Sequence, residues 1–244
     1  MKRGKKIGIA LGVAGVGAGL LAAYGLAIRP WHLRWGATDE ELTETLPGDE
    51  VKRDAGIQVT HAVTVNAPPS YVWKWLIQIG QGRGGFYSYD QVENLIGLDI
   101  HNVDEIRPEL QHLSVGDFIR SAHEGWLGGR FDNLAGWHVV TLEPERVLVL
   151  RDEIEFGSWS FILRPNERNG TRLIIRGRGD KPMSLGRQIF HFSVFEPAHF
   201  IMERKMLLTL KQRAERTYAE DIRASHWQSQ EGDHDVIVSP RDWN

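Results

Sequence analysis

The 244-residue sequence contains no cysteine, which excludes disulfide bonds, thiolate catalysis, iron–sulfur clusters and cysteine-ligated zinc. It also lacks a surplus of positive charge, because 29 Lys and Arg residues stand against 32 Asp and Glu residues. A formal net charge of -3 argues against a nucleic-acid binder that relies on overall basicity. The 41% hydrophobic and 25% charged residues are typical of a globular protein.

Recognisable catalytic and metal-binding motifs are missing as well. The ten histidines are scattered without an H-E-x-x-H or similar close pair, so neither a metal site nor a cofactor is predicted. A serine hydrolase motif of the G-x-S-x-G type is absent. The run GQGRGG at 80–85 lacks a Gly-Lys-Ser/Thr ending and follows a predicted helix instead of a strand. We interpret it as a flexible loop at a cavity mouth.

Charge is absent from residues 7–28, an apolar stretch of 22 residues. As a helix it spans about 33 Å, enough for the ~30 Å hydrocarbon core of a bilayer. Four basic residues precede it, so the first 28 residues carry +4 and the remainder carries -7. The positive-inside bias predicts a retained single-pass anchor with a cytoplasmic N-terminus and residues 29–244 outside the cytoplasm. The alternative is a cleaved signal peptide and a secreted domain.

Beyond the apolar stretch, the hydrophobic pattern predicts an α+β fold. Residues 29–56 are polar and acidic, and we interpret them as a connector. Residues 57–65 alternate between apolar and polar side chains as a half-buried strand does. Pro68-Pro69-Ser70 opens a helix that Gly80 ends, and a second short helix is expected over 89–96. Strands are expected near 116–122, 137–143, 146–152, 157–164 and 171–178, with one more short strand between Trp126 and Phe131.

The last predicted element is a long amphipathic helix from Glu196 to about Arg223. Apolar residues recur along it at helical spacing, and the polar sequence from Ser225, within 225–244, is interpreted as a loose tail. The stripe consists of His199, Met202, Met206, Leu210, Ala214 and Tyr218. An antiparallel sheet needs a cover for its apolar face, and only this helix is long enough. We therefore expect a domain over 57–224 that folds by itself, with room for a cavity between sheet and helix.

Several sequence strings occur in a recognisable order over about residues 36–222. They are Ala67-Pro68-Pro69-Ser70-Tyr71-Val72-Trp73, then Gln78-Ile79-Gly80, then Arg83-Gly84-Gly85-Phe86-Tyr87-Ser88-Tyr89-Asp90, and then Val115-Gly116-Asp117. With them the sequence resembles the SRPBCC superfamily, the START and Bet v 1-like helix-grip proteins, and a bacterial membrane-anchored subgroup of it. The resemblance implies a curved antiparallel sheet wrapped around the C-terminal helix, with a hydrophobic cavity. It implies no single activity, because the superfamily includes lipid carriers, pigment binders, polyketide cyclases and co-chaperones.

The residues expected to line or border this cavity come from the first helix, the glycine-rich loop and the last helix. They are Trp73, Arg83, Phe86, Tyr87, Asp90, His199, Met202 and Met206. For Arg83 we favour an ion pair with Asp90 or Asp117 over a contact with ligand. Tyr87 is also consistent with a packed lid, and Asp90 with a cap of the following helix. His199 is a cavity histidine, or a general base with Glu203 one helical turn away as its partner.

Three functional hypotheses follow. The first is a membrane-tethered binding or carrier domain for an apolar small molecule or lipid, supported by nine Trp residues and the absence of a convincing catalytic set. The second is an enzyme of the cyclase or dehydratase kind that acts on an apolar substrate in the same cavity. The third is an interaction scaffold whose cavity is collapsed. The expected partners are an apolar ligand and a membrane, and not a nucleic acid.

Overall fold

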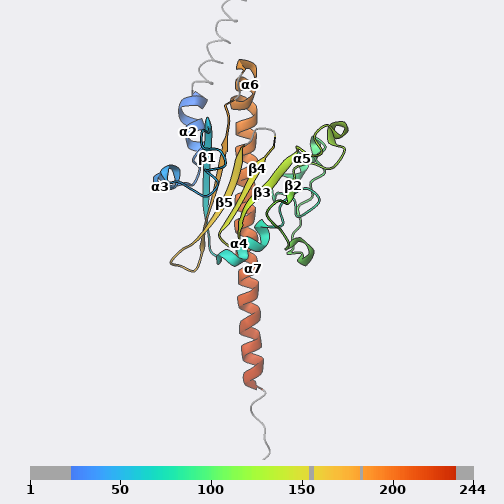
Figure 1. Cartoon of the computed structure of the whole chain (residues 1–244). Coiled ribbons are helices and arrows are strands. Elements are labelled where there is room, and N and C mark those ends of the chain that lie inside the picture. The colour runs from blue at the N-terminus through green and yellow to red at the C-terminus, as the bar shows by residue number, and fades with distance from the viewer. Residues whose placement is uncertain (1–22, 154–156, 182–183, 235–244) are drawn as a thin grey trace, which may run out of the picture.

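The computed structural model describes residues 23–153, 157–181 and 184–234, and its centre is a six-stranded antiparallel sheet (Figure 1). The strand order is β1-β6-β5-β4-β3-β2. The strands are β1 (Ile57–Val65), β2 (Phe118–Arg120), β3 (Gly136–Glu143), β4 (Val147–Asp152), β5 (Ser158–Pro165) and β6 (Thr171–Gly179). The predicted α+β class is confirmed, and each of the expected strands is present, although β2 is shortened to three residues.

The helices lie before, within and after the run of strands. They are the π-helical turn η1 (Tyr24–Ile28), α2 (Arg29–His32), α3 (Asp39–Thr43), α4 (Pro69–Leu76), α5 (Asp90–Leu95), the 3-10 turns η2 (Pro108–Leu110) and η3 (Trp126–Gly129), α6 (Leu185–Phe190), the π-helical turn η4 (His191–Phe195) and α7 (Glu196–His234). The extra strand expected between Trp126 and Phe131 is wrong. Leu127 and Gly128 have positive φ angles of 51° and 75°, which an extended strand cannot accommodate.

Helix α7 covers one face of the sheet, as the sequence predicts (Figure 1). Odd-numbered residues of β1, such as Val63 and Val65, belong to the same buried cluster as the apolar stripe of α7. That stripe is Met206, Leu207, Leu210 and Ala214, each at most 2% exposed. The predicted helix face is therefore confirmed. Together the sheet and α7 form the helix-grip arrangement that the resemblance implied.

The predicted end of this helix near Arg223 is wrong, and so is the loose tail over 225–234. Helix α7 continues to His234, and its last turns extend beyond the sheet (Figure 1). No proline occurs in this stretch and the first glycine is Gly232, so the chain contains no strong helix breaker before that point. Residues 235–244 of the predicted tail lie outside the described part of the chain.

The opposite face of the sheet is covered by residues of the 29–56 segment, which we expected to be a connector. Leu46 is 1% exposed and packs with Ala62 of β1 and Ile174 of β6. On the same face of the sheet, the side chain of Arg176 of β6 is also 1% exposed. Its guanidinium donates hydrogen bonds to the Asp49 carboxylate over 2.9 Å and to the Glu44 carbonyl oxygen over 2.8 Å. The segment thus supplies both apolar cover and the countercharge for a buried arginine.

Two further ion pairs fasten the same segment to the strands. Arg172 of β6 contacts Glu41 at 2.7 Å, and Arg164 of β5 contacts Glu44 at 2.8 Å. Thr38 and Glu41 also form a reciprocal capping box at the start of α3. The acidic character of the segment therefore matches a row of arginines on the outer face of the sheet.

The predicted membrane anchor lies largely outside the described residues, because the description begins at Ala23. From Ala23 to Ile28 the chain is helical. Within residues 23–153, 157–181 and 184–234, none of the helices combines the length and apolar character that crossing a bilayer requires.

Candidate functional site

A cavity of about 250 Å³ lies between the sheet and α7, at the end of the domain where α6 joins α7. Most of its wall is aromatic or aliphatic. The apolar lining residues are Phe86, Leu98, Ile100, Trp137, Trp159, Phe195, Met202 and Met206, and the polar ones are Ser88, Glu93, Ser121, His199 and Glu203. An apolar wall with a few polar groups is the usual composition of a small-molecule site.

A second hollow of about 560 Å³ adjoins this cavity and is more open to the surface. The two share a wall that consists of Ser121, Trp137, Trp159, Phe195 and His199. The turn that contains Leu127, Phe131 and Leu134 forms another side of the outer hollow. Small-molecule sites commonly occupy about 300–1,000 Å³, and the two adjoining spaces together fall in that range.

The shared wall is built on two strands that flank β4. Trp137 lies on β3 and Trp159 on β5, and their ring centroids are 5.1 Å apart. Phe86 stands edge-on to Trp137 at 5.8 Å. In the sheet, β3 and β5 are the two neighbours of β4. Trp137 and Trp159 pair with Asp152 and Leu150 of β4, which point to the same face, so the aromatic side chains gather above β4. They offer a broad aromatic surface to an apolar molecule.

The innermost polar group of the cavity is Glu203 of α7, which is 5% exposed. Its Oε2 lies 2.5 Å from Nδ1 of His61, and its Oε1 accepts a hydrogen bond from the Trp159 indole over 2.7 Å. The other imidazole nitrogen, Nε2 of His61, lies 2.6 Å from the His32 carbonyl oxygen. Nε2 faces a carbonyl oxygen and therefore carries a proton, and with Glu203 ionised Nδ1 also donates, which makes His61 a cation.

The pKa values of this pair agree with a buried ion pair. Burial opposes the charge of Glu203, but the charge and hydrogen bond of His61 outweigh it and lower the pKa of Glu203 to about 2. Burial likewise disfavours the charged form of His61, and the Glu203 carboxylate overcomes this and raises the pKa of His61. Both oxygens of Glu203 are thus occupied, and the pair fixes α7 to β1 instead of offering a free group to a ligand.

Glu93 of α5 brings a second carboxyl group to the cavity, and this one is unpaired. Its side chain is 8% exposed, and its buried Oε2 has no hydrogen-bond partner among the described residues. Burial, with a smaller contribution from the Asp90 charge, raises the pKa of Glu93 to about 7. Near neutral pH the carboxyl group is therefore partly protonated, and it can donate or accept a hydrogen bond inside an apolar space.

Four of the eight residues expected at the cavity do line it: Phe86, His199, Met202 and Met206. His199 is exposed at the mouth, where it stacks on Phe195 with ring centroids 5.8 Å apart. The predicted hydrogen-bonded pair of His199 with Glu203 is not present, because Glu203 is bound by His61 and Trp159.

Trp73 and Arg83 do not reach the cavity. Trp73 of α4 is 8% exposed and packs in the main hydrophobic core. Arg83 donates to the carbonyl oxygens of Ile77 over 2.8 Å and Leu110 over 3.1 Å. The ion pair of Arg83 with Asp90 or Asp117 is therefore replaced by backbone contacts that hold the glycine-rich loop.

Tyr87 and Asp90 line a separate hollow of about 340 Å³ on the other side of Ser88. The backbone turns at Tyr87, whose φ is 57°, and its hydroxyl donates to the Trp75 carbonyl over 3.0 Å. Burial raises the pKa of Tyr87 to about 12, so it is a poor proton donor. Asp90 accepts a hydrogen bond from the Gln91 amide at the start of α5. Neither residue is part of the lining of the main cavity, and the turn at residue 87 directs the Tyr87 side chain into the core.

Sequence reasoning missed Glu93, His61, Trp137 and Trp159. His61 had a usable signal, since it shares the phase of Val63 on β1 and so had to face α7. No comparable signal marks Glu93, which is buried on a helix whose apolar Leu95 is 86% exposed. In the part of the chain that the structure describes, no group of three or more His, Asp or Glu side chains is arranged to hold a metal ion.

No family model matches the chain, and neither does any curated protein. Several solved structures, however, are similar to it. The chain is similar to the Aha1 dimer from Colwellia psychrerythraea, with 16% identity, 65% of this chain and 96% of that chain covered, and a TM-score of 0.37. A polyketide cyclase-like protein from Corynebacterium glutamicum is 15% identical over 67% and 92% of the two chains, with a TM-score of 0.31. A protein from Nitrosomonas europaea is 12% identical over 68% and 99%, with a TM-score of 0.38.

Identities below 25% and TM-scores below 0.5 carry no argument about function. The helix-grip arrangement is instead supported by the strand order and by the packing of α7 on the sheet. The chemistry of the site is inferred from its own geometry. The membrane-anchored subgroup named from the sequence stays a prediction.

Proposed function

We propose that this protein binds an apolar small molecule or lipid between the sheet and α7, as a carrier domain tethered to a membrane by residues 7–28 and placed outside the cytoplasm. The observation that supports binding most directly is the aromatic wall of Trp137 and Trp159 beside an open space of about 250 Å³. In a scaffold with a collapsed cavity, core side chains would fill this space at crystal-like density. The tether is supported by the 22 uncharged residues and the basic residues before them.

The two carboxyl groups in the cavity lining, Glu93 and Glu203, indicate which kinds of ligand the cavity can bind. Glu203 is already paired, so Glu93 is the carboxyl group free to bind a ligand. A neutral ligand with one hydroxyl or aromatic amine group satisfies Glu93, whereas a fatty acid would bring a third carboxyl group beside the two glutamates. We therefore favour an apolar molecule that carries a hydrogen-bond donor at one end.

Proton-transfer catalysis on an apolar substrate is the second candidate, and Glu93 is the observation that favours it. A carboxyl group with a pKa of about 7 in an apolar cavity suits general acid–base chemistry of the cyclase or dehydratase kind. Tyr87, Asp90 and Arg83 do not take part in this version, because they lie away from the cavity. If a ligand extracted from the purified protein is converted by the wild type but only bound by Glu93→Gln, catalysis is supported.

The binding proposal is tested with the full chain in lipid nanodiscs and the neutral amine probe N-phenyl-1-naphthylamine, read by energy transfer from tryptophan. Ser121 contributes to both adjoining spaces, so Ser121→Phe should fill them and weaken the probe at least tenfold. The matched control Ser114→Phe lies on an exposed turn and should bind like the wild type. Equal binding by both variants would show that the probe is in the lipid or elsewhere, and would reject the cavity as the binding site.

A further inference from the structure

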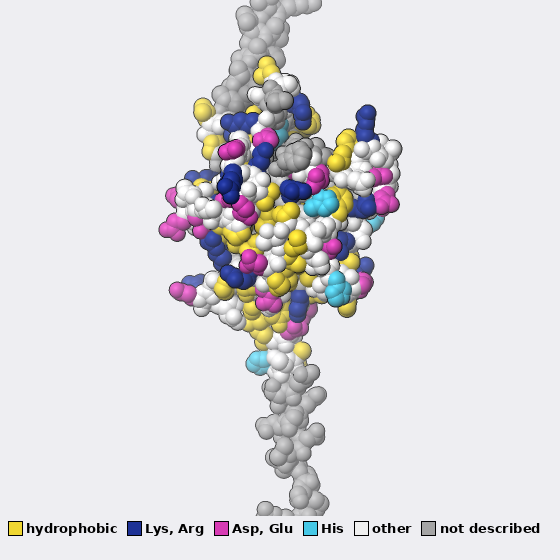
Figure 2. Space-filling model, viewed as in Figure 1, with side chains coloured by type: hydrophobic (Ala, Val, Ile, Leu, Met, Phe, Trp, Pro, Cys, Tyr) yellow, Lys and Arg dark blue, Asp and Glu magenta, His cyan; other side chains and the backbone are white. Residues whose placement is uncertain are grey.

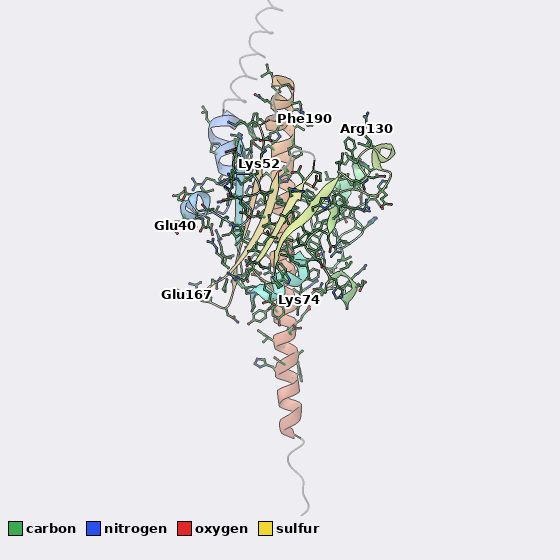
Figure 3. All side chains as sticks on the ribbon, in the orientation of Figure 1. Glu40, Lys52, Lys74, Arg130, Glu167 and Phe190 are labelled. Carbon is green, nitrogen blue, oxygen red and sulfur yellow. The ribbon has the colours of Figure 1, made fainter. Side chains whose placement is uncertain are left out.

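Large apolar side chains are exposed along α6 and η4, at the end of the molecule where α2 also lies (Figure 1). Phe190, labelled in Figure 3, is the last residue of α6 and is 59% exposed. Yellow side chains are visible at the same end in Figure 2. We call this patch the α6 surface, and it consists of Leu185, Ile189, Phe190, Val194 and Phe195. Large exposed apolar side chains gathered at one end of a molecule are a mark of contact with a membrane or another protein.

The beginning of the described chain is fastened to the base of this surface. Arg29 forms a two-pronged ion pair with the buried Glu196, with N–O distances of 2.9 and 3.0 Å. The same guanidinium lies 4.9 Å from the centre of the Phe192 ring. Trp31 packs edge-on against Phe200 of α7 at 5.4 Å. The segment that leads out of the uncharged stretch 7–28 and the helix α6 therefore leave the domain at the same end.

The charged residues of the first described segment and of the α6 surface are basic, and two of them are held in ion pairs, Arg29 with Glu196 and Arg34 with Asp39. Residues 23–35 contain Arg29 and Arg34, residues 185–195 contain Arg187, and neither range contains an Asp or Glu. Leu26 and Ile28, at 82% and 51% exposure, extend the apolar character on the side of the first segment. Apolar side chains with basic residues at their edge are typical of structures that lie in the interface of an anionic bilayer.

The α6 surface is also continuous with the cavity. Phe195 belongs to the exposed patch and to the wall that both hollows share, and His199 follows it one turn later. The wider π-helical turn His191–Phe195 connects the exposed helix to these two residues, and such turns are frequent at functional sites. Whatever covers the α6 surface therefore stands next to the cavity mouth.

We propose that the α6 surface is immersed in the headgroup region of a lipid bilayer, beside the anchor, and holds the cavity mouth against the membrane so that the ligand enters from the lipid. This inference rests on the proposed function, since it uses both the anchor and the cavity. A bilayer is favoured over a second copy of the chain because the uncharged stretch 7–28 ends beside the surface and because the charged residues within 23–35 and 185–195 are all basic.

Because the chain has no cysteine, single cysteines report on chosen positions without background. We would attach an environment-sensitive fluorophore to Ile189→Cys in the full chain, reconstituted in vesicles of phosphatidylcholine and phosphatidylglycerol that contain a nitroxide lipid. The matched control is Ile222→Cys, on an exposed position of the far part of α7. Quenching at 189 should exceed quenching at 222 several-fold, and equal quenching would overturn the proposal.

A third variant, Val13→Cys, separates this proposal from the anchor. Quenching at 13 without quenching at 189 would reject the α6 surface and keep the anchor. Quenching at 189 without quenching at 13 would support the surface and reject the anchor, and quenching at neither position would reject both. Efficient cross-linking between two chains through Cys at 189 would show that a second copy covers the surface, and would likewise overturn the proposal.

Discussion

Glu93→Gln should stabilise the protein above neutral pH, although it removes a native side chain. The pKa of Glu93 rises from 4.5 in a model compound to about 7 in the folded chain, chiefly because of burial. Below pH 4.5 the carboxyl group is protonated in both folded and unfolded chains, so it causes no pH-dependent change. Between pH 4.5 and 7 the unfolded chain ionises first and the folded state loses stability, and above pH 7 the loss is complete. At ~1.4 kcal/mol for each pKa unit, the loss is about 3 kcal/mol.

Glutamine keeps the shape of the protonated side chain and cannot ionise, so the variant escapes this loss. For a domain of this size we expect a melting temperature roughly 6–12 °C above the wild type at about pH 8, and no difference at about pH 4. The assay is thermal unfolding of the full chain in a nonionic detergent, followed by circular dichroism. The exposed Glu109→Gln is the control, and its difference from the wild type should not vary with pH.

A constant difference between Glu93→Gln and the wild type across this pH range would refute the reasoning, because it would mean that the buried carboxyl group has an ordinary pKa. The expected result would also bear on function. A group that costs stability at neutral pH is retained for a reason other than stability, and binding or proton transfer in the cavity supplies one.

Three more substitutions test the packing around the site. Met206→Asp places a charge in the core beneath the cavity and should abolish cooperative unfolding of the domain; an unchanged melting curve would show that our helix face is rotated. Glu203→Leu should lower the free energy of unfolding by about 3–5 kcal/mol, because it leaves His61 without its ion-pair partner. In urea titrations the double variant with His61→Leu should lose less than the sum of the two single variants, and additive losses would show that the two residues are not coupled. Gly36→Ala should cost about 1–3 kcal/mol, because φ is 75° and a Cβ would collide with the Ala62 carbonyl oxygen; wild-type stability in urea would disprove the steric argument.

The elements that the sequence predicted well carry their signal locally. Most of β1 alternates between apolar and polar residues, α4 begins at a Pro-Pro-Ser sequence, and Met206 and Leu210 repeat at the spacing of a helix. The end of α7 was misplaced because neither a proline nor an early glycine marks it, so the polar composition alone suggested a tail.

The contacts that were missed join residues distant in sequence. Arg176 and Asp49 are separated by 127 positions, so the acidic segment 29–56 gave no local hint that it covers the sheet. His61 and Glu203 meet across 142 positions for the same reason. The cavity was predicted where residues lie on one helix face, as Met202 and Met206 do, and missed where side chains from separate strands converge.

Mass spectrometry of the intact full chain, released from membranes in a mild detergent, tests the central claim most directly. The account predicts one bound apolar molecule of a few hundred daltons on the wild type and on Ser114→Phe, and its loss from Ser121→Phe, in which the space between the sheet and α7 is filled. Folded wild-type and Ser121→Phe chains with the same bound molecule, or with none at all, would contradict a ligand site between the sheet and α7.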